Sequence, residues 1–238
     1  MNDLLEAAVV AHGGLDRWNG ISSITVNASI TGAVWPVKGV AEAIKEVRFE
    51  VDTRREHLTM EYVGQDRVSV FEPDRVVVQS GDGKNVRTRN DPQRSFQGHQ
   101  FETRWDDLHL AYFTGAALWT YLNTPFLFTR PGFSTDEITP IQMDGETWRR
   151  LEVTFPEDIK THSRKQIFCF GPDGLLRRHD FNIDVIAGAP AELYAEDYRD
   201  LDGIVIPTKR RAYDLQSGGD PRSSPLMVGI DMGEISIH

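Results

Sequence analysis

The sequence lacks the features that would mark several common protein classes. Its only cysteine, Cys169, rules out an intramolecular disulfide, and the apolar neighbours of that residue indicate a buried, inert thiol. It contains no run of about 18 apolar residues that would form a membrane span, and its N-terminus lacks the basic and apolar segments of a secretory signal. We therefore expect a cytoplasmic protein without integral membrane association.

Basic charge and known catalytic motifs are also scarce. The 36 acidic residues outnumber the 26 basic ones, and the resulting net charge of −10 argues against a nucleic-acid partner. The chain has no G-x-G-x-x-G, P-loop, G-x-S-x-G or H-E-x-x-H motif and no cysteine cluster. Nucleotide binding, serine hydrolysis and zinc-protease chemistry are therefore unsupported, and we predict no cofactor and no metal.

Hydrophobic residues, by contrast, are plentiful enough for a sizeable core, at 39% of the chain, with aromatics at 10%. The longest apolar segment, residues 104–128, has no proline between Trp105 and Leu122, and its large side chains recur at helical spacing. Its second half is apolar on almost every side, which is typical of a buried helix. We expect Pro125 to end this helix.

The remaining sequence alternates apolar and polar residues in short segments bounded by turn residues, which predicts β-strands. We expect an N-terminal helix at 3–18, stopped or kinked at Gly13-Gly14, a polar loop at 80–97 and one helical turn at 134–137. A turn is expected at 218–221. Strands are expected at 21–34, 40–51, 57–63, 67–71, 75–79, 147–155, 165–170, 175–186, 191–199, 204–215 and 227–237.

With no internal repeat and no linker, the economical interpretation is one domain over residues 1–238. Its fold class is mostly β (α+β): a single curved antiparallel sheet of about ten strands around a helical plug, with an N-terminal helix. A sheet curled around a buried helix often encloses a cavity.

Several short motifs resemble the lipoprotein-carrier superfamily of LolA-like and LppX-like proteins. They are the N-terminal helix followed by Gly-Gly and Trp18, the helical plug, the hairpin FGPDGLLRRHDF and the strand pair AEDYRDLDGIVIPTKRR. The resemblance implies a half-open β-barrel with an apolar cavity that holds acyl chains or other hydrophobic molecules. Members of that superfamily carry signal peptides, and we find none in this sequence.

The hairpin near Gly174 supplies the first candidate for chemistry. If Phe170 pairs with Leu176, one sheet face carries a polar set in which a His–Asp pair beside an arginine can perform acid–base work. The alternative is a salt-bridged outer face, and a register shift of one residue would bring His179 to this face instead. The set comprises His162, Gln166, Arg178, Asp180 and Asp184.

A second candidate lies at the start of the long helix. Asp106 and His109 are one turn apart and can form a general-base pair. If the helix begins early, His99 and Glu102 join them in a stripe suited to a divalent ion. A solvated polar face is the alternative for this stripe, and a helix that starts at Thr103 would remove His99 and Glu102 from it.

These observations leave three hypotheses. The leading one is a protein that binds a hydrophobic small molecule, lipid or acyl chain, although core packing explains the aromatic residues equally well. The alternative is an enzyme that acts on an apolar molecule in the same cavity through His162, Arg178 and Asp180, or through Asp106 and His109. The third is a self-associating or partner-binding module with an exposed apolar patch and an unpaired strand edge. The residues expected to line the cavity are Trp105, His109, Tyr112, Trp119, Phe126, Phe168 and Gln166.

Overall fold

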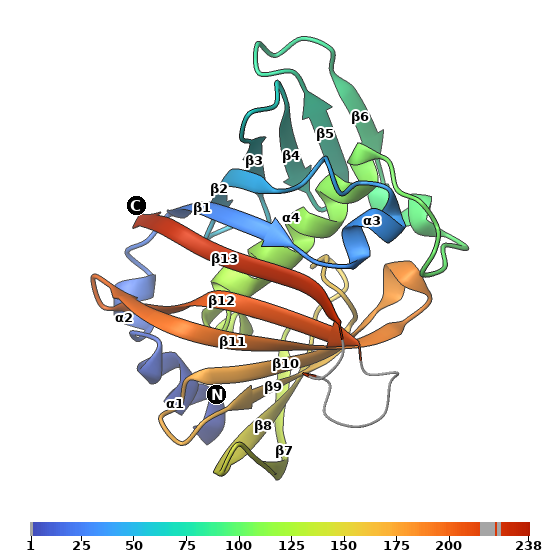
Figure 1. The fold of residues 1–238 in the computed structure, drawn as a ribbon. Coiled ribbons are helices and arrows are strands. Elements are labelled where there is room, and N and C mark those ends of the chain that lie inside the picture. Colours follow the sequence, from blue (N-terminus) through green and yellow to red (C-terminus); the bar gives the residue numbers. More distant parts are fainter. Residues whose placement is uncertain (1, 215–221, 223–224) are drawn as a thin grey trace.

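The computed structural model describes residues 2–214, 222 and 225–238, and the strands in these ranges form one antiparallel sheet (Figure 1). The turn expected at 218–221 and residue 215 of the strand expected at 204–215 lie outside the described residues. The helices are α1 (Asp3–Ala11), α2 (Leu15–Trp18), α3 (Val34–Lys38) and α4 (Asp107–Asn123), with 3-10 turns η1 (Pro92–Phe96), η2 (Phe126–Thr129) and η3 (Asp184–Ile186).

Thirteen strands make up the described sheet. They are β1 (Ser23–Thr31), β2 (Glu46–Asp52), β3 (Leu58–Tyr62), β4 (Val68–Glu72), β5 (Arg75–Gln79), β6 (Arg87–Asn90), β7 (Ser134–Met143), β8 (Glu146–Thr154), β9 (Lys165–Phe170), β10 (Leu176–Ile183), β11 (Ala189–Leu201), β12 (Ile204–Asp214) and β13 (Leu226–Ile237).

The C-terminal strand joins the two halves of the sheet. The strand order is β6-β5-β4-β3-β2-β1-β13-β12-β11-β10-β9-β8-β7, so β13 pairs with both β1 and β12. Apart from the β1–β13 pair, all neighbouring strands in this order are also consecutive in the sequence. The mostly β fold with one curved, open antiparallel sheet confirms the predicted class, although the sheet has three strands more than the ten or so expected.

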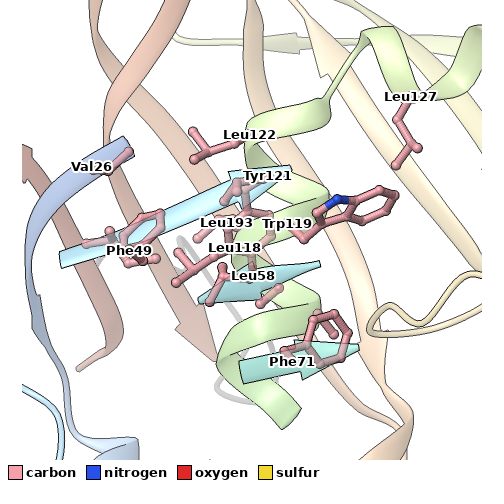
Figure 2. Close-up of a cluster of buried hydrophobic side chains, with 14 of the residues drawn as sticks. Val26, Phe49, Leu58, Phe71, Leu118, Trp119, Tyr121, Leu122, Leu127 and Leu193 are labelled. Carbon is pink, nitrogen blue, oxygen red and sulfur yellow. The ribbon is translucent and has the colours of Figure 1, made fainter. Parts of the chain in front are cut away.

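Helix α4 lies against the inner side of the curved sheet, where it contacts β2 to β6 (Figure 1). Figure 2 shows Leu118, Trp119 and Leu122 of α4 among buried side chains of the first strands, including Phe49 and Leu58. Gly115 permits the close approach, because a Cβ there would lie 2.3 Å from the ring of Phe71. No helix in the described part of the chain is long and apolar enough to cross a membrane.

Glycine also explains the break in the N-terminal helix. Gly13 and Gly14 both have positive φ angles, and a Cβ on Gly13 would lie 2.1 Å from the carbonyl oxygen of Gly203. The expected helix at 3–18 is therefore divided into α1 and α2 at these glycines.

Two local expectations about the edge strands are wrong, and the strand expected at 40–51 begins only at Glu46. Residues 134–137 begin β7 rather than a helical turn, and the expected loop at 80–97 contains β6 and η1. β6 and β7 each have one strand neighbour, and their polar sequences show no clear burial alternation. The charges of β6 and the acidic residues and Pro140 of β7 are features that discourage pairing with another chain.

The described residues form no large exposed apolar patch, which is one of the two features expected of a partner-binding module. The large hydrophobic side chains that are exposed there are four valines from different segments: Val10, Val37, Val63 and Val86. Singly exposed apolar residues of this kind are normal for a protein surface.

Candidate functional site

A cavity of about 200 Å³ lies between α4 and the part of the sheet formed by β1 and β10 to β13. Its lining is mostly aliphatic and aromatic, and Glu102 at its edge is the one acidic or basic side chain, histidine aside, among the described lining residues. The part contributed by α4 is a single helix face, because its members are spaced by one helical turn: Phe113, Thr114, Ala117, Leu118 and Tyr121.

A buried lysine fixes the segment that forms one edge of this cavity. Lys38, at the end of α3, is 0% exposed, and its Nζ donates to the carbonyl oxygens of Gln100 (3.2 Å) and Phe101 (2.5 Å). The same ammonium lies 4.8 Å from the ring centre of Trp105. Lys38 thereby holds Phe101 and Trp105 in the cavity lining.

Two side chains of the described lining, Tyr121 and His162, are hydrogen-bonded to each other. The Tyr121 hydroxyl lies 2.7 Å from Nε2 of His162. Burial lowers the pKa of His162 to about 3 and raises the pKa of Tyr121 above its usual range, so both groups are neutral at physiological pH. His162 also stacks on Phe181 of β10, with ring centroids 4.2 Å apart and planes 7° apart.

The hairpin that carries the predicted acid–base set has a different register from the one expected. Leu176 does pair with Phe170, but a bulge between Leu176 and Arg178 then places His179 opposite Phe168 and Asp180 opposite Ile167. This is the register shift that sends His179 to the inner face. The expectation that Gln166, Arg178 and Asp180 share one face of the sheet is therefore wrong.

Arg178 and Asp180 consequently lie on the other face of the sheet from His162. There Arg178 contacts the carboxylates of Asp180 at 2.7 Å and Glu192 at 3.1 Å, and Tyr194 donates to Glu192. Cys169 is buried in the hydrophobic cluster on that face, and burial raises its pKa to about 12, which makes its thiol inert.

On the inner face, Gln166 and His179 form a separate pair. His179 Nε2 is hydrogen-bonded to Gln166 Oε1, and Gln166 donates to the carbonyl oxygen of Ser163. His179 also stacks on Phe168, with centroids 4.1 Å apart. The Gln166 side chain is therefore hydrogen-bonded within the core, and Phe168 is packed there. Neither residue lines the cavity.

Asp106 and His109 lie close together, with His109 Nδ1 2.7 Å from Asp106 Oδ1, and they also make the contacts of a helix cap. The Asp106 side chain accepts from the His109 backbone N–H (2.8 Å), and His109 Nδ1 accepts from the Asp106 N–H (3.3 Å). Burial acts to raise the pKa of Asp106, but hydrogen bonds from Arg89 and His109 outweigh it and lower this pKa to about 2.

The four-residue metal stripe does not form, because α4 starts at Asp107 and leaves His99 and Glu102 outside the helix. In the described ranges, no group of three or more histidine, cysteine or acidic residues is arranged to hold a metal ion.

Of the residues expected to line the cavity, the structure brings Trp105 to it, together with His162 from the catalytic set. His109, Tyr112, Trp119 and Phe126 lie elsewhere. Trp119 Nε1 donates to the carbonyl oxygens of Asp52 (2.9 Å) and Arg55 (2.8 Å). Tyr112 packs on Phe71 and Phe96, and Phe126 stacks on Trp18.

Sequence reasoning missed Lys38 and Phe181, and it did not distinguish Tyr121 from the other aromatic residues of α4. A helical wheel drawn from Phe113 and Ala117 would have found Tyr121 on the same face. For Lys38 and Phe181 the sequence offers no comparable signal, since their roles depend on segments 62 and 19 residues away.

Comparison with known proteins gives the fold its class. No family model matches the chain, and no curated protein matches it. A LolA superfamily protein from Nitrosomonas europaea aligns with 99% of this chain and 92% of its own, at 12% identity and a TM-score of 0.55. A putative outer membrane lipoprotein-sorting protein domain from Vibrio parahaemolyticus aligns with 99% of this chain and 91% of its own, at 10% identity and a TM-score of 0.57. The protein thus has a LolA-like fold, and at these identities the likeness concerns the fold alone.

Proposed function

We propose that this protein binds a hydrophobic small molecule or a single acyl chain in the cavity between α4 and strands β10 to β13. The observation that carries the proposal is the lining itself, in which aliphatic and aromatic side chains surround one neutral polar pair. A cavity of about 200 Å³ compares with the engineered apolar cavity of about 150 Å³ that binds benzene or xenon.

The fold agrees with this proposal by analogy, because one neighbour is described as a lipoprotein-sorting domain. The enzymatic alternative has less support. Arg178 and Asp180 do not share a face with His162. A histidine whose pKa is lowered to about 3 by burial is a weak base at neutral pH.

Filling the cavity from α4 tests the proposal. Ala117 lines the cavity and is buried, so Ala117→Phe adds a ring to the space that the ligand would occupy. We expect the wild-type protein to bind the neutral dye N-phenyl-1-naphthylamine with enhanced fluorescence, and the variant to bind it at least about tenfold more weakly.

Val10→Phe is the control, because Val10 is a helical residue that is 68% exposed. It adds the same side chain outside the cavity and should leave the affinity for the dye unchanged. A folded Ala117→Phe protein with wild-type affinity would show that the dye binds elsewhere and would contradict the proposal.

A further inference from the structure

The hydrogen bond between Tyr121 and His162 determines which ring nitrogen carries the imidazole proton. The Tyr121 side chain is buried, and His162 Nε2 is the one described partner of its hydroxyl. A buried hydroxyl proton without an acceptor is costly, so the hydroxyl donates and Nε2 accepts. Because the imidazole is neutral, its single proton is then on Nδ1.

The Nδ1–H group of His162 has no partner among the described residues. The other two buried histidines direct their single N–H at an oxygen of the protein: His12 Nδ1 at the Ala8 carbonyl oxygen (2.8 Å), and His179 Nε2 at Gln166 Oε1. His162 is only 6% exposed, yet it forms part of the cavity lining. Its unused donor is therefore available to a molecule in the cavity.

The orientation of this ring is fixed from several sides. The Tyr121 hydroxyl holds Nε2, the ring of Phe181 stacks on one face, and the ring of Phe113 lies 5.4 Å away. A donor that is held in place before binding loses little conformational entropy when it meets its acceptor.

We propose that the ligand carries an ester, ketone or carboxyl oxygen that accepts a hydrogen bond from Nδ1–H of His162, while its hydrocarbon part fills the apolar remainder of the cavity. This inference rests on the proposed function and narrows its ligand class from hydrocarbons in general to molecules with an acceptor oxygen. Arg210 does not supply a competing anchor, because it does not line the cavity and its Nη2 donates to the Tyr121 carbonyl oxygen at 2.9 Å.

Two ligands that differ in one oxygen test the inference. We would measure displacement of N-phenyl-1-naphthylamine by 2-decanone and by decane, in the wild type and in the variant Tyr121→Phe/His162→Phe. The double variant removes both hydrogen-bonding partners and keeps aromatic rings at both positions, so no buried hydroxyl is left unpaired. We expect it to bind 2-decanone about tenfold more weakly than the wild type does, and decane within about twofold.

Thr114→Val is the matched control, because the Thr114 hydroxyl also belongs to a residue of the cavity lining but already donates to the Leu110 carbonyl oxygen at 2.8 Å. This variant should change the affinities for 2-decanone and decane by the same factor. If the wild type binds neither ligand nor dye, the proposed function fails. If it binds both ligands and the double variant leaves their ratio unchanged, the inference alone is overturned.

A measurement on the wild-type protein does not depend on the stability of any variant. In ¹⁵N NMR spectra of the histidine side chains, we expect His162 to show a protonated Nδ1 and an unprotonated Nε2, with the Nδ1 proton shifting when 2-decanone is added. Protonation at Nε2 instead would overturn the inference.

Discussion

His162 and Phe181 stack face to face, with ring centroids 4.2 Å apart and planes 7° apart, although 19 residues separate them in sequence. The stack depends on the bulge between Leu176 and Arg178, which turns His179 and Phe181 toward the inside of the sheet. It joins the segment before β9 to strand β10 at the wall of the cavity. The aromatic surroundings of His162 thus come from a local irregularity of one strand.

The first prediction concerns the Tyr121–His162 pair and stability. His162→Phe removes the acceptor of a buried hydroxyl, so we expect the free energy of unfolding to fall by about 1–3 kcal/mol. Adding Tyr121→Phe should recover part of this loss, because the unpaired hydroxyl is then gone. Urea unfolding of the two single variants and the double variant gives the coupling energy. Additive losses would show that the two side chains do not interact.

Trp119 provides a second prediction, since the structure places it in the core rather than in the cavity. Trp119→Phe keeps most of the packing but removes the donor to the carbonyl oxygens of Asp52 and Arg55. We expect it to destabilise the protein by about 1–2 kcal/mol and to leave dye affinity within about twofold. A loss of dye binding without destabilisation would show that Trp119 belongs to the ligand site after all.

The third prediction is that stability falls as the pH drops below about 6.5. Burial lowers the pKa of His12 to about 4 and of His162 to about 3, and lowers that of His179 well below 6.5. Between these values and 6.5 the unfolded chain binds protons that the folded protein does not, so acid favours unfolding. Thermal melting from pH 6.5 to pH 4 should show a steadily decreasing melting temperature.

Glu56 gives a fourth prediction, with the opposite sign. Burial raises the pKa of this carboxyl to about 8, against hydrogen bonds from the Lys160 backbone N–H. The folded protein therefore retains a proton that the unfolded chain loses above about 4.5, and this contribution to stability is lost as the pH rises toward 8. Between pH 7 and 8 the histidines are mostly deprotonated in both states, so the loss of the Glu56 contribution should lower stability there.

Glu56→Gln isolates that effect, because glutamine resembles the neutral carboxyl and can still accept from the Lys160 N–H. We expect the variant to gain at least about 1.4 kcal/mol relative to the wild type between pH 5 and pH 8, the equivalent of one pKa unit. Chemical denaturation at the two pH values measures the difference. Parallel pH profiles for the two proteins would mean that Glu56 is already ionised when folded.

Asp180 supplies a fifth prediction, which separates binding from the enzymatic alternative. Its carboxylate pairs with Arg178 on the face of the sheet away from the cavity. Asp180→Asn should lower the free energy of unfolding, by up to about 3–5 kcal/mol because it leaves a buried arginine less compensated. It should not change the affinity for 2-decanone or the dye. A loss of affinity in a folded variant would show that the two faces are coupled.

Much of the fold follows from the sequence. The alternation of buried and exposed residues in β1 and β2 reflects a sheet with one buried face, and it is visible in the chain itself. The absence of proline from Trp105 to Leu122 and the apolar character of that segment predict α4, and Gly13-Gly14 predicts the helix break. These features depend on residues close together in sequence, so local patterns contain the necessary information.

The tertiary structure alone determined the cavity and its polar pair. One bulge moved Arg178 and Asp180 out of the predicted set and brought His179 inward, and no local pattern in the hairpin indicates it. The helix α4 is apolar on nearly all sides, so its sequence does not distinguish the face of Trp119, which packs into the core, from the face of Tyr121, which borders the cavity. That choice depends on which half of the sheet approaches each face, and it is fixed only when β13 joins the two halves.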